Sequence, residues 1–123
     1  MGCNNEAVKK FVQKIIDDNI IAVFSKTECP YCIKAITILK GYNPNSMHVE
    51  QIEKNPNMAD IQAYLKDLTG KSSVPRIFIN KEFVGGCDDL VRHHMEKFTK
   101  EVVKLLTKWL AAIKKKKKKE RKK

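Results

Sequence analysis

Apolar residues recur at helical spacing in some segments of the chain and form unbroken runs in others. In residues 6–18 the apolar positions fall on one face of a helix. These positions are Val8, Phe11, Val12, Ile15 and Ile16. They predict an amphipathic helix that ends at Asn19. The next segment, residues 20–24, is β-branched and aromatic without alternation, which is typical of a strand covered on both faces.

Proline and glycine mark the ends of the next helix. Pro30 favours the first helical position, because its missing N–H would be unpaired there, and Gly41 favours the end. The rest of the pattern predicts a strand at 47–52, a helix at 57–70, strands at 76–79 and 82–84 around a turn at Asn80 and Lys81, a helix from Cys87 and a last amphipathic helix at 96–113.

The order of these elements predicts the sheet. The first two strands flank a helix, which implies a parallel pair with a right-handed crossover. The last two strands are joined by a hairpin and are therefore antiparallel. We expect an α/β fold in which a four-stranded mixed sheet is flanked by helices on both faces.

The composition is that of one folded domain with a charged appendage. The chain has 123 residues, of which 42% are hydrophobic and 32% charged, and this balance suits a single core rather than a disordered chain. The formal net charge is +11, but residues 114–123 alone hold nine basic and one acidic side chain, whereas the other 113 residues hold 16 and 13. We expect a domain over residues 1–113 and a disordered lysine-rich tail over 114–123.

The tail and the helix before it leave several partners open. A lysine run binds anionic surfaces such as acidic proteins, RNA or lipid headgroups, or serves as a nuclear import signal. No aromatic residue interrupts it, so we expect no specific nucleic-acid recognition. The apolar face of the helix favours docking on the sheet, and it also suits an anionic membrane surface. This face contains Phe98, Val102, Leu105, Leu106, Trp109, Leu110 and Ile113.

The cysteines indicate the compartment and the chemistry. The longest apolar run is too short to cross a bilayer, and the first residues lack the pattern of a secretion signal. We expect a cytoplasmic, reducing location, where the Cys-x-x-Cys at 29–32 indicates redox or metal chemistry. Met1-Gly2-Cys3 resembles a lipidation site, but Glu6 stands where that pattern requires Ser or Thr. We expect Cys3 to be an exposed thiol in a mobile N-terminus.

Cys29 stands directly before the helix-opening Pro30, at the end of a strand-to-helix loop. At the N-cap its sulfur would face free backbone N–H groups and the positive end of the helix dipole, which stabilise a thiolate. Lys26 adds a cation in the same loop, and a sulfur stabilised in this way is also a good leaving group. We interpret Cys29 as the nucleophile and Cys32, in the first helical turn, as the less exposed resolving thiol.

Two other interpretations of the cysteine pair are inert small side chains and half of a zinc site. Further zinc ligands would come from His48, Cys87, His93 and His94. The chain has no second Cys-x-x-Cys and no histidine pair at the spacing common in zinc sites. The redox interpretation is therefore favoured.

Three motifs, in this order, resemble those of the dithiol glutaredoxins. They are Lys26-Thr27-Glu28-Cys29-Pro30-Tyr31-Cys32, Ser73-Val74-Pro75 and Gly85-Gly86-Cys87-Asp88-Asp89. The resemblance covers residues 8–95. It implies a thioredoxin-like fold, the reduction of protein–glutathione mixed disulfides and small disulfides at the expense of glutathione, and no tightly bound cofactor.

The resemblance also implies a set of site residues. Cys29 and Cys32 would be catalytic, and Pro75 would follow a cis peptide bond. The expected glutathione contacts are Lys26, Tyr31, Gln62, Val74, Pro75, Gly86, Cys87, Asp88 and Asp89. Glutathione carries two carboxylates and one ammonium, so a cation at one end and amide donors beside a carboxylate at the other suit it. The expected partners are glutathione and proteins with disulfides or glutathionylated cysteines, and we expect a monomer.

Two related classes fit less well. Thioredoxins would show Trp-Cys-Gly-Pro-Cys, which this chain lacks. Relatives that hold an iron–sulfur cluster between two subunits usually lack a proline after the first cysteine, so Pro30 argues against cluster carriage. Cys87 is interpreted as a small neutral filler at a helix start, with a regulatory thiol as the alternative. His93-His94 and the basic helix depart from the family's usual ending.

Overall fold

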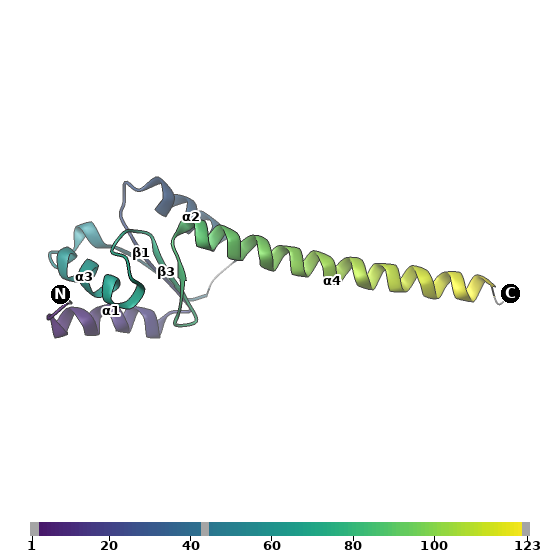
Figure 1. The fold of residues 1–123 in the computed structure, drawn as a ribbon, viewed down its shortest axis with the longest axis horizontal. Helices are drawn as coiled ribbons and strands as arrows, with labels where there is room; N and C mark the ends of the chain where they lie inside the picture. Colours follow the sequence, from purple (N-terminus) through teal and green to yellow (C-terminus); the bar gives the residue numbers. More distant parts are fainter. Residues whose placement is uncertain (1–2, 43–44, 122–123) are drawn as a thin grey trace. The chain divides into compact units, whose positions relative to one another are not determined.

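The structure is a computed structural model that describes residues 3–42 and 45–121 (Figure 1). The Met1-Gly2 part of the lipidation-like motif and the last two residues of the tail lie outside this range. The chain divides into two compact units, Met1–Val91 and Arg92–Lys123.

The first unit contains a mixed α/β arrangement. Its elements are α1 (Glu6–Asp18), β1 (Ile21–Ser25), α2 (Pro30–Lys40), β2 (Met47–Gln51), the 3-10 turn η1 (Ile52–Lys54), α3 (Met58–Thr69), β3 (Arg76–Ile79), β4 (Glu82–Gly85) and the start of α4 (Cys87–Arg121). The four strands lie in the order β2-β1-β3-β4, with β1 parallel to β2 and the other two pairs antiparallel. The predicted four-stranded mixed sheet is confirmed.

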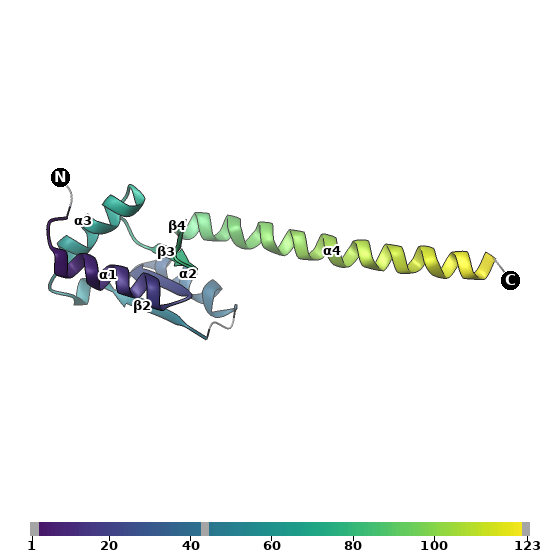
Figure 2. The same cartoon turned by 90° about the horizontal axis from the view of Figure 1, so that it is seen from below.

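Helices cover both faces of this sheet, and the central strand β1 is therefore buried along its whole length. On one face Ala22 and Phe24 pack in a cluster with apolar residues of α1 and α3, which lie beside each other in Figure 1 and Figure 2. On the other face Ile21 and Val23 pack with α2 and with Leu90 in the first turns of α4. Each face therefore has its own core.

The boundaries of β1 differ by one residue from the predicted strand at 20–24. Ile20 is 49% exposed and precedes the strand, whereas Ser25 is its last residue and is buried. Pairing with β2 sets these limits, since the parallel register runs from Ile21 beside Met47 to Ser25 beside Gln51. The Ser25 hydroxyl donates to the Lys26 carbonyl at 3.3 Å, so a polar residue is accommodated in the core.

The prediction that Cys3 is an exposed thiol in a mobile N-terminus is wrong. Cys3 is 4% exposed and belongs to the core cluster of α1 and α3. Its backbone N–H donates to Asp67 Oδ2 at 2.9 Å, which holds this part of the N-terminus beside α3. A contact between residues so far apart in sequence has no signature in a local pattern.

The two helices predicted after residue 87 are one continuous helix, α4. The sequence from 87 to 113 contains neither proline nor glycine, so nothing interrupts the backbone hydrogen bonds between the two predicted segments. In the second unit several apolar side chains of α4 are exposed, namely Val102, Val103, Leu105, Leu106, Trp109 and Leu110. The division between a domain and a tail at residue 113 stays a prediction. Among the described residues, none of the helices is long and apolar enough to cross a membrane.

Candidate active site

Cys29 is the N-cap of α2, as the sequence predicted. Its backbone is extended, with φ −119° and ψ 108°, and its carbonyl accepts a hydrogen bond from the Ile33 N–H at 3.0 Å. The backbone N–H of Cys32 donates to Cys29 Sγ at 3.2 Å. The sulfur therefore accepts a backbone hydrogen bond at the positive end of the helix dipole. Cys29 is only half-buried, so reagents can reach it.

Cys32 differs from Cys29 in both access and protonation. Its side chain is fully buried, which confirms that it is the less exposed of the pair. Burial, together with its hydrogen bond to Cys29, raises the pKa of Cys32 to about 11 from an ordinary value of 9.0, although hydrogen bonds from the Lys26 backbone and Ser25 act in the opposite direction. At neutral pH Cys32 therefore carries its proton.

A carboxylate that the sequence analysis missed holds the loop before Cys29. Both the backbone N–H and the hydroxyl of Thr27 donate to Glu53 Oε1, the former at 2.9 Å. These hydrogen bonds lower the pKa of Glu53, with the hydroxyl as the larger cause. Because β1 and β2 are parallel, the residues that follow them meet at one edge of the sheet. The predicted parallel pair was the signal that could have found Glu53.

A pocket of about 210 Å³ lies between the start of α2, the residues that lead into β3 (the β3 entry, residues 74–76) and the start of α4. It is lined by Tyr31, Lys71, Val74, Pro75, Arg76, Gly86, Cys87, Asp88 and Asp89. All the residues predicted to contact glutathione line it, except Lys26 and Gln62. Lys71 and Arg76 were not predicted. Three segments distant in sequence thus meet at one concave site.

Arg76, the first residue of β3, contacts both the residue before it and strand β4. The peptide bond between Val74 and Pro75 is cis, as expected, and the Arg76 Nε–H donates to the Pro75 carbonyl at 3.1 Å. The guanidinium lies 5.3 Å from the centre of the Phe83 ring. Burial lowers the pKa of Arg76, and the nearby charge of Asp89 partly opposes this shift.

The stretch after β4 forms a capped helix start. The Gly86 carbonyl accepts from the Leu90 N–H at 3.0 Å, and the Gly86 N–H donates to Asp89 Oδ2 at 3.0 Å. This contact is one half of a capping box, in which a side chain in the first turn satisfies the N–H of the cap residue. The Asp89 carboxylate thus has a structural role, while Asp88 is exposed. The first backbone N–H groups of α4 have no intrahelical partners and are suited to an anion.

Cys87 lies in the same helix start and is buried, with 5% of its surface exposed. Burial is the largest cause that raises the pKa of this thiol, and the charges of Asp88 and Cys29 add to it, while Lys34 acts in the opposite direction. A buried, protonated thiol agrees with the interpretation of Cys87 as a small neutral side chain. In the part of the chain that the structure describes, no three His, Cys, Asp or Glu side chains are grouped so that they could hold a metal ion.

Comparison with known proteins identifies the family. Residues 21–84 match the glutaredoxin family model. Glutaredoxin-1 of Rhizophagus irregularis is 45% identical over 84 residues, which are 68% of this chain and 82% of that protein. The chain belongs to the glutaredoxin family. It is therefore a glutathione-dependent thiol–disulfide oxidoreductase, with glutathione as its co-substrate.

Solved glutaredoxin structures agree with this fold. The crystal structure of oxidized glutaredoxin 2 from Chlamydomonas reinhardtii is 35% identical, with a TM-score of 0.69, and the match covers 85% of this chain and 95% of that one. The buckwheat glutaredoxin–glutathione complex is 28% identical, with a TM-score of 0.68 and coverage of 75% and 83%. The thioredoxin-like fold predicted for this glutaredoxin is confirmed.

Proposed function

We propose that Cys29 is the attacking sulfur and that Cys32 is the resolving thiol. The Cys29 thiolate attacks the glutathione sulfur of a protein–glutathione mixed disulfide, so that a Cys29–glutathione disulfide forms and the protein leaves as a thiolate. A second glutathione thiolate then attacks the bound glutathione sulfur, which releases oxidised glutathione and restores the Cys29 thiolate. For a protein disulfide, Cys29 first forms a mixed disulfide with one substrate sulfur and releases the other as a thiolate. Cys32 then attacks Cys29, which releases the substrate's second thiolate and leaves a Cys29–Cys32 disulfide. Two glutathione molecules reduce this disulfide and leave as oxidised glutathione.

The observation that carries this assignment is the difference between the cysteines. Cys29 is half-buried and accepts a backbone hydrogen bond at a helix N-terminus, whereas Cys32 and Cys87 are buried and their pKa values are raised. Cys3 is also buried, in the core beside α3. Nucleophilic attack requires access to the sulfur, and Cys29 is the one of the four described cysteines that is not buried.

We propose that glutathione occupies the pocket described above. Cys29 does not line it, but Cys87 does, and the charge of Cys29 acts on the Cys87 thiol. Lys71, an exposed residue that lines the pocket, supplies a cation for one carboxylate of glutathione, and the N–H groups at the start of α4 suit the other carboxylate. Asp88 is exposed beside them and offers a counter-charge for the ammonium group. Lys26 and Gln62 keep their proposed roles from the family resemblance, although neither lines the pocket.

The alkylation order of the cysteines tests the assignment of the nucleophile. With a pKa of about 11 instead of 9.0, Cys32 holds about a hundredfold less thiolate at neutral pH than an ordinary thiol. Iodoacetamide at neutral pH should therefore modify Cys29 first, and peptide mapping by mass spectrometry locates the label. The same protein in urea, where all four cysteines should react, is the control. Earlier labelling of Cys32 or Cys87 would contradict the assignment.

Charge reversal at Lys71 tests the glutathione site. The Lys71→Glu protein should show a KM for a glutathionylated peptide about tenfold higher, because an attraction to a carboxylate becomes a repulsion. The kcat should change little, since Lys71 does not contact the reacting sulfurs. Lys66→Glu, which makes the same change on the exposed side of α3, is the matched control and should leave KM unaltered. Equal KM values for the two variants would remove Lys71 from the site.

The wider setting of this activity is also a proposal. We propose that the protein works as a monomer in a reducing, cytoplasmic environment on proteins with disulfides or glutathionylated cysteines. Its cysteines at positions 3, 29, 32 and 87 are all unpaired, which suits such an environment.

A further inference from the structure

The part of α4 that lies in the second unit is strongly amphipathic. Seven of its large apolar side chains are between 36% and 68% exposed: Met95, Val102, Val103, Leu105, Leu106, Trp109 and Leu110. At about 100° of rotation per residue they occupy an arc of about 160° around the helix. Trp109, the single tryptophan of the chain, lies well inside this arc. We call these seven residues the apolar face.

The opposite side of the same helix is basic. Lys97, Lys100, Lys104 and Lys108 fall within an arc of about 80° centred opposite the apolar face. The charge of the chain is concentrated in this unit: residues 92–123 hold fourteen basic and three acidic side chains, whereas residues 1–91 hold eleven of each. The entire formal charge of +11 therefore belongs to the unit that carries the apolar face.

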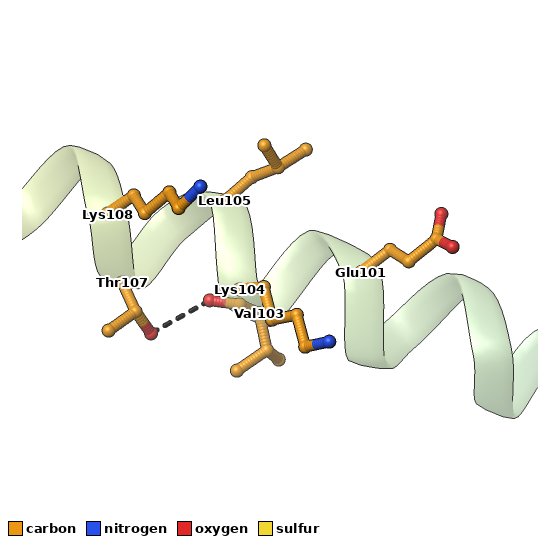
Figure 3. Close-up of a pocket in the computed structure, with 6 residues that line it drawn as sticks. All are labelled: Glu101, Val103, Lys104, Leu105, Thr107 and Lys108. Atoms are coloured by element: carbon orange, nitrogen blue, oxygen red, sulfur yellow. Dashed lines mark hydrogen bonds between the residues drawn. The ribbon is translucent and has the colours of Figure 1, made fainter.

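A hollow on this segment of α4 does not have the form of a small-molecule site. Its volume is about 540 Å³, and all six of its lining residues, from Glu101 to Lys108, come from the same helix (Figure 3). Thr107 donates to the Val103 carbonyl at 2.8 Å, which is a contact within the helix (Figure 3). A hollow with a single wall cannot enclose a ligand as an ordinary binding pocket does.

We propose that residues 92–113 bind flat on the surface of a bilayer that contains anionic lipids, with the apolar face in the acyl boundary and the lysines toward the headgroups. Helices of this kind combine a lysine-rich polar face with Trp and Leu on the other side. The following lysine run adds electrostatic attraction to anionic lipid. A spanning mode does not apply to the described residues, because none of their helices is apolar enough.

Charge selects this occupant over the alternatives. A second copy of the chain would bring two units of the same +11 charge together, and like charges oppose pairing. A nucleic acid would match the lysines but would leave the apolar face in water. An anionic bilayer satisfies both sides of the helix at once.

The intrinsic fluorescence of Trp109 tests the proposal on the full chain. Vesicles of phosphatidylcholine mixed with phosphatidylserine should shift the emission to shorter wavelength and carry the protein into the pellet. Vesicles of phosphatidylcholine alone should do so much less. Higher salt should weaken binding, because it screens attraction to the headgroups.

A matched pair of variants separates insertion from simple charge attraction. Leu106→Gln removes one apolar side chain from the apolar face and should weaken partition into mixed vesicles about tenfold. Thr107→Gln introduces the same side chain at the next position, which lies outside the apolar face, and should leave partition unchanged. Reduction of hydroxyethyl disulfide with glutathione should be equal in both variants, which shows that the catalytic unit is intact.

Four results would overturn the proposal. The first is a lack of binding to mixed vesicles, and the second is equal partition of the two variants, which would mean that the lysines act alone. The third is an emission maximum that is already at short wavelength, without vesicles, in a dimer that dissociates on dilution; the apolar face would then be covered by a second copy. The fourth is the same emission in a monomer, which would mean that the face packs on the protein's own domain.

Discussion

A Cys29→Ser protein reduces glutathionylated substrates at least about a thousandfold more slowly than the unaltered protein. Serine keeps the shape of the side chain at the N-cap and can still accept the Cys32 N–H, so α2 keeps its start. It cannot form a disulfide with glutathione. The loss is therefore chemical, and it should be seen in the turnover of a glutathionylated peptide while the unfolding transition changes little.

Cys32→Ser is the matched control for this prediction. It should retain reduction of glutathionylated substrates, which needs only Cys29 and a second glutathione, and it should lose much of the reduction of protein disulfides. The raised pKa of Cys32 fits a resolving role, because two of its causes come from Cys29 and disappear once Cys29 is in a disulfide. Full activity of the Cys29→Ser protein would falsify the assignment. So would a loss of both reactions in Cys32→Ser but not in Cys29→Ser.

The sequence was sufficient for those parts of the fold that depend on local patterns. The limits of α1 were predicted at both ends, because Asn19 follows a regular apolar stripe. Pro30 predicted the start of α2 and therefore the N-cap position of Cys29. The turn between β3 and β4 has positive φ at Asn80 and Lys81, as a tight hairpin requires. In each case one or two residues determine the backbone conformation.

Contacts between distant segments could not be predicted in the same way. Thr27 and Glu53 are joined by hydrogen bonds across the sheet edge, and Cys3 is held by Asp67. Lys71 and Arg76 line the pocket only because the β3 entry meets the start of α4. Such contacts follow from the tertiary arrangement, so only the residues that also belong to a recognisable motif could be placed in the site beforehand.

A Gly85→Ala protein should unfold about 3 kcal/mol more easily than the unaltered protein. Gly85 has φ +132°, a conformation that alanine rarely adopts, and an added Cβ would collide with Asp89 Oδ2. The same carboxylate oxygen accepts the Gly86 N–H at the start of α4. The methyl group would therefore both strain the backbone and displace the cap of the helix that forms one wall of the pocket.

Gly70→Ala separates these two causes. Gly70 also has positive φ, at +86°, but a Cβ there meets nothing within 4 Å. This variant should lose only about 1 kcal/mol, the cost of the left-handed backbone for alanine. Urea unfolding gives both values. The KM for a glutathionylated peptide should rise in Gly85→Ala alone, since only that change moves Asp89 and the N–H groups beside it. Equal losses of stability in the two variants would show that the contact with Asp89 contributes nothing, and that backbone strain accounts for the whole effect.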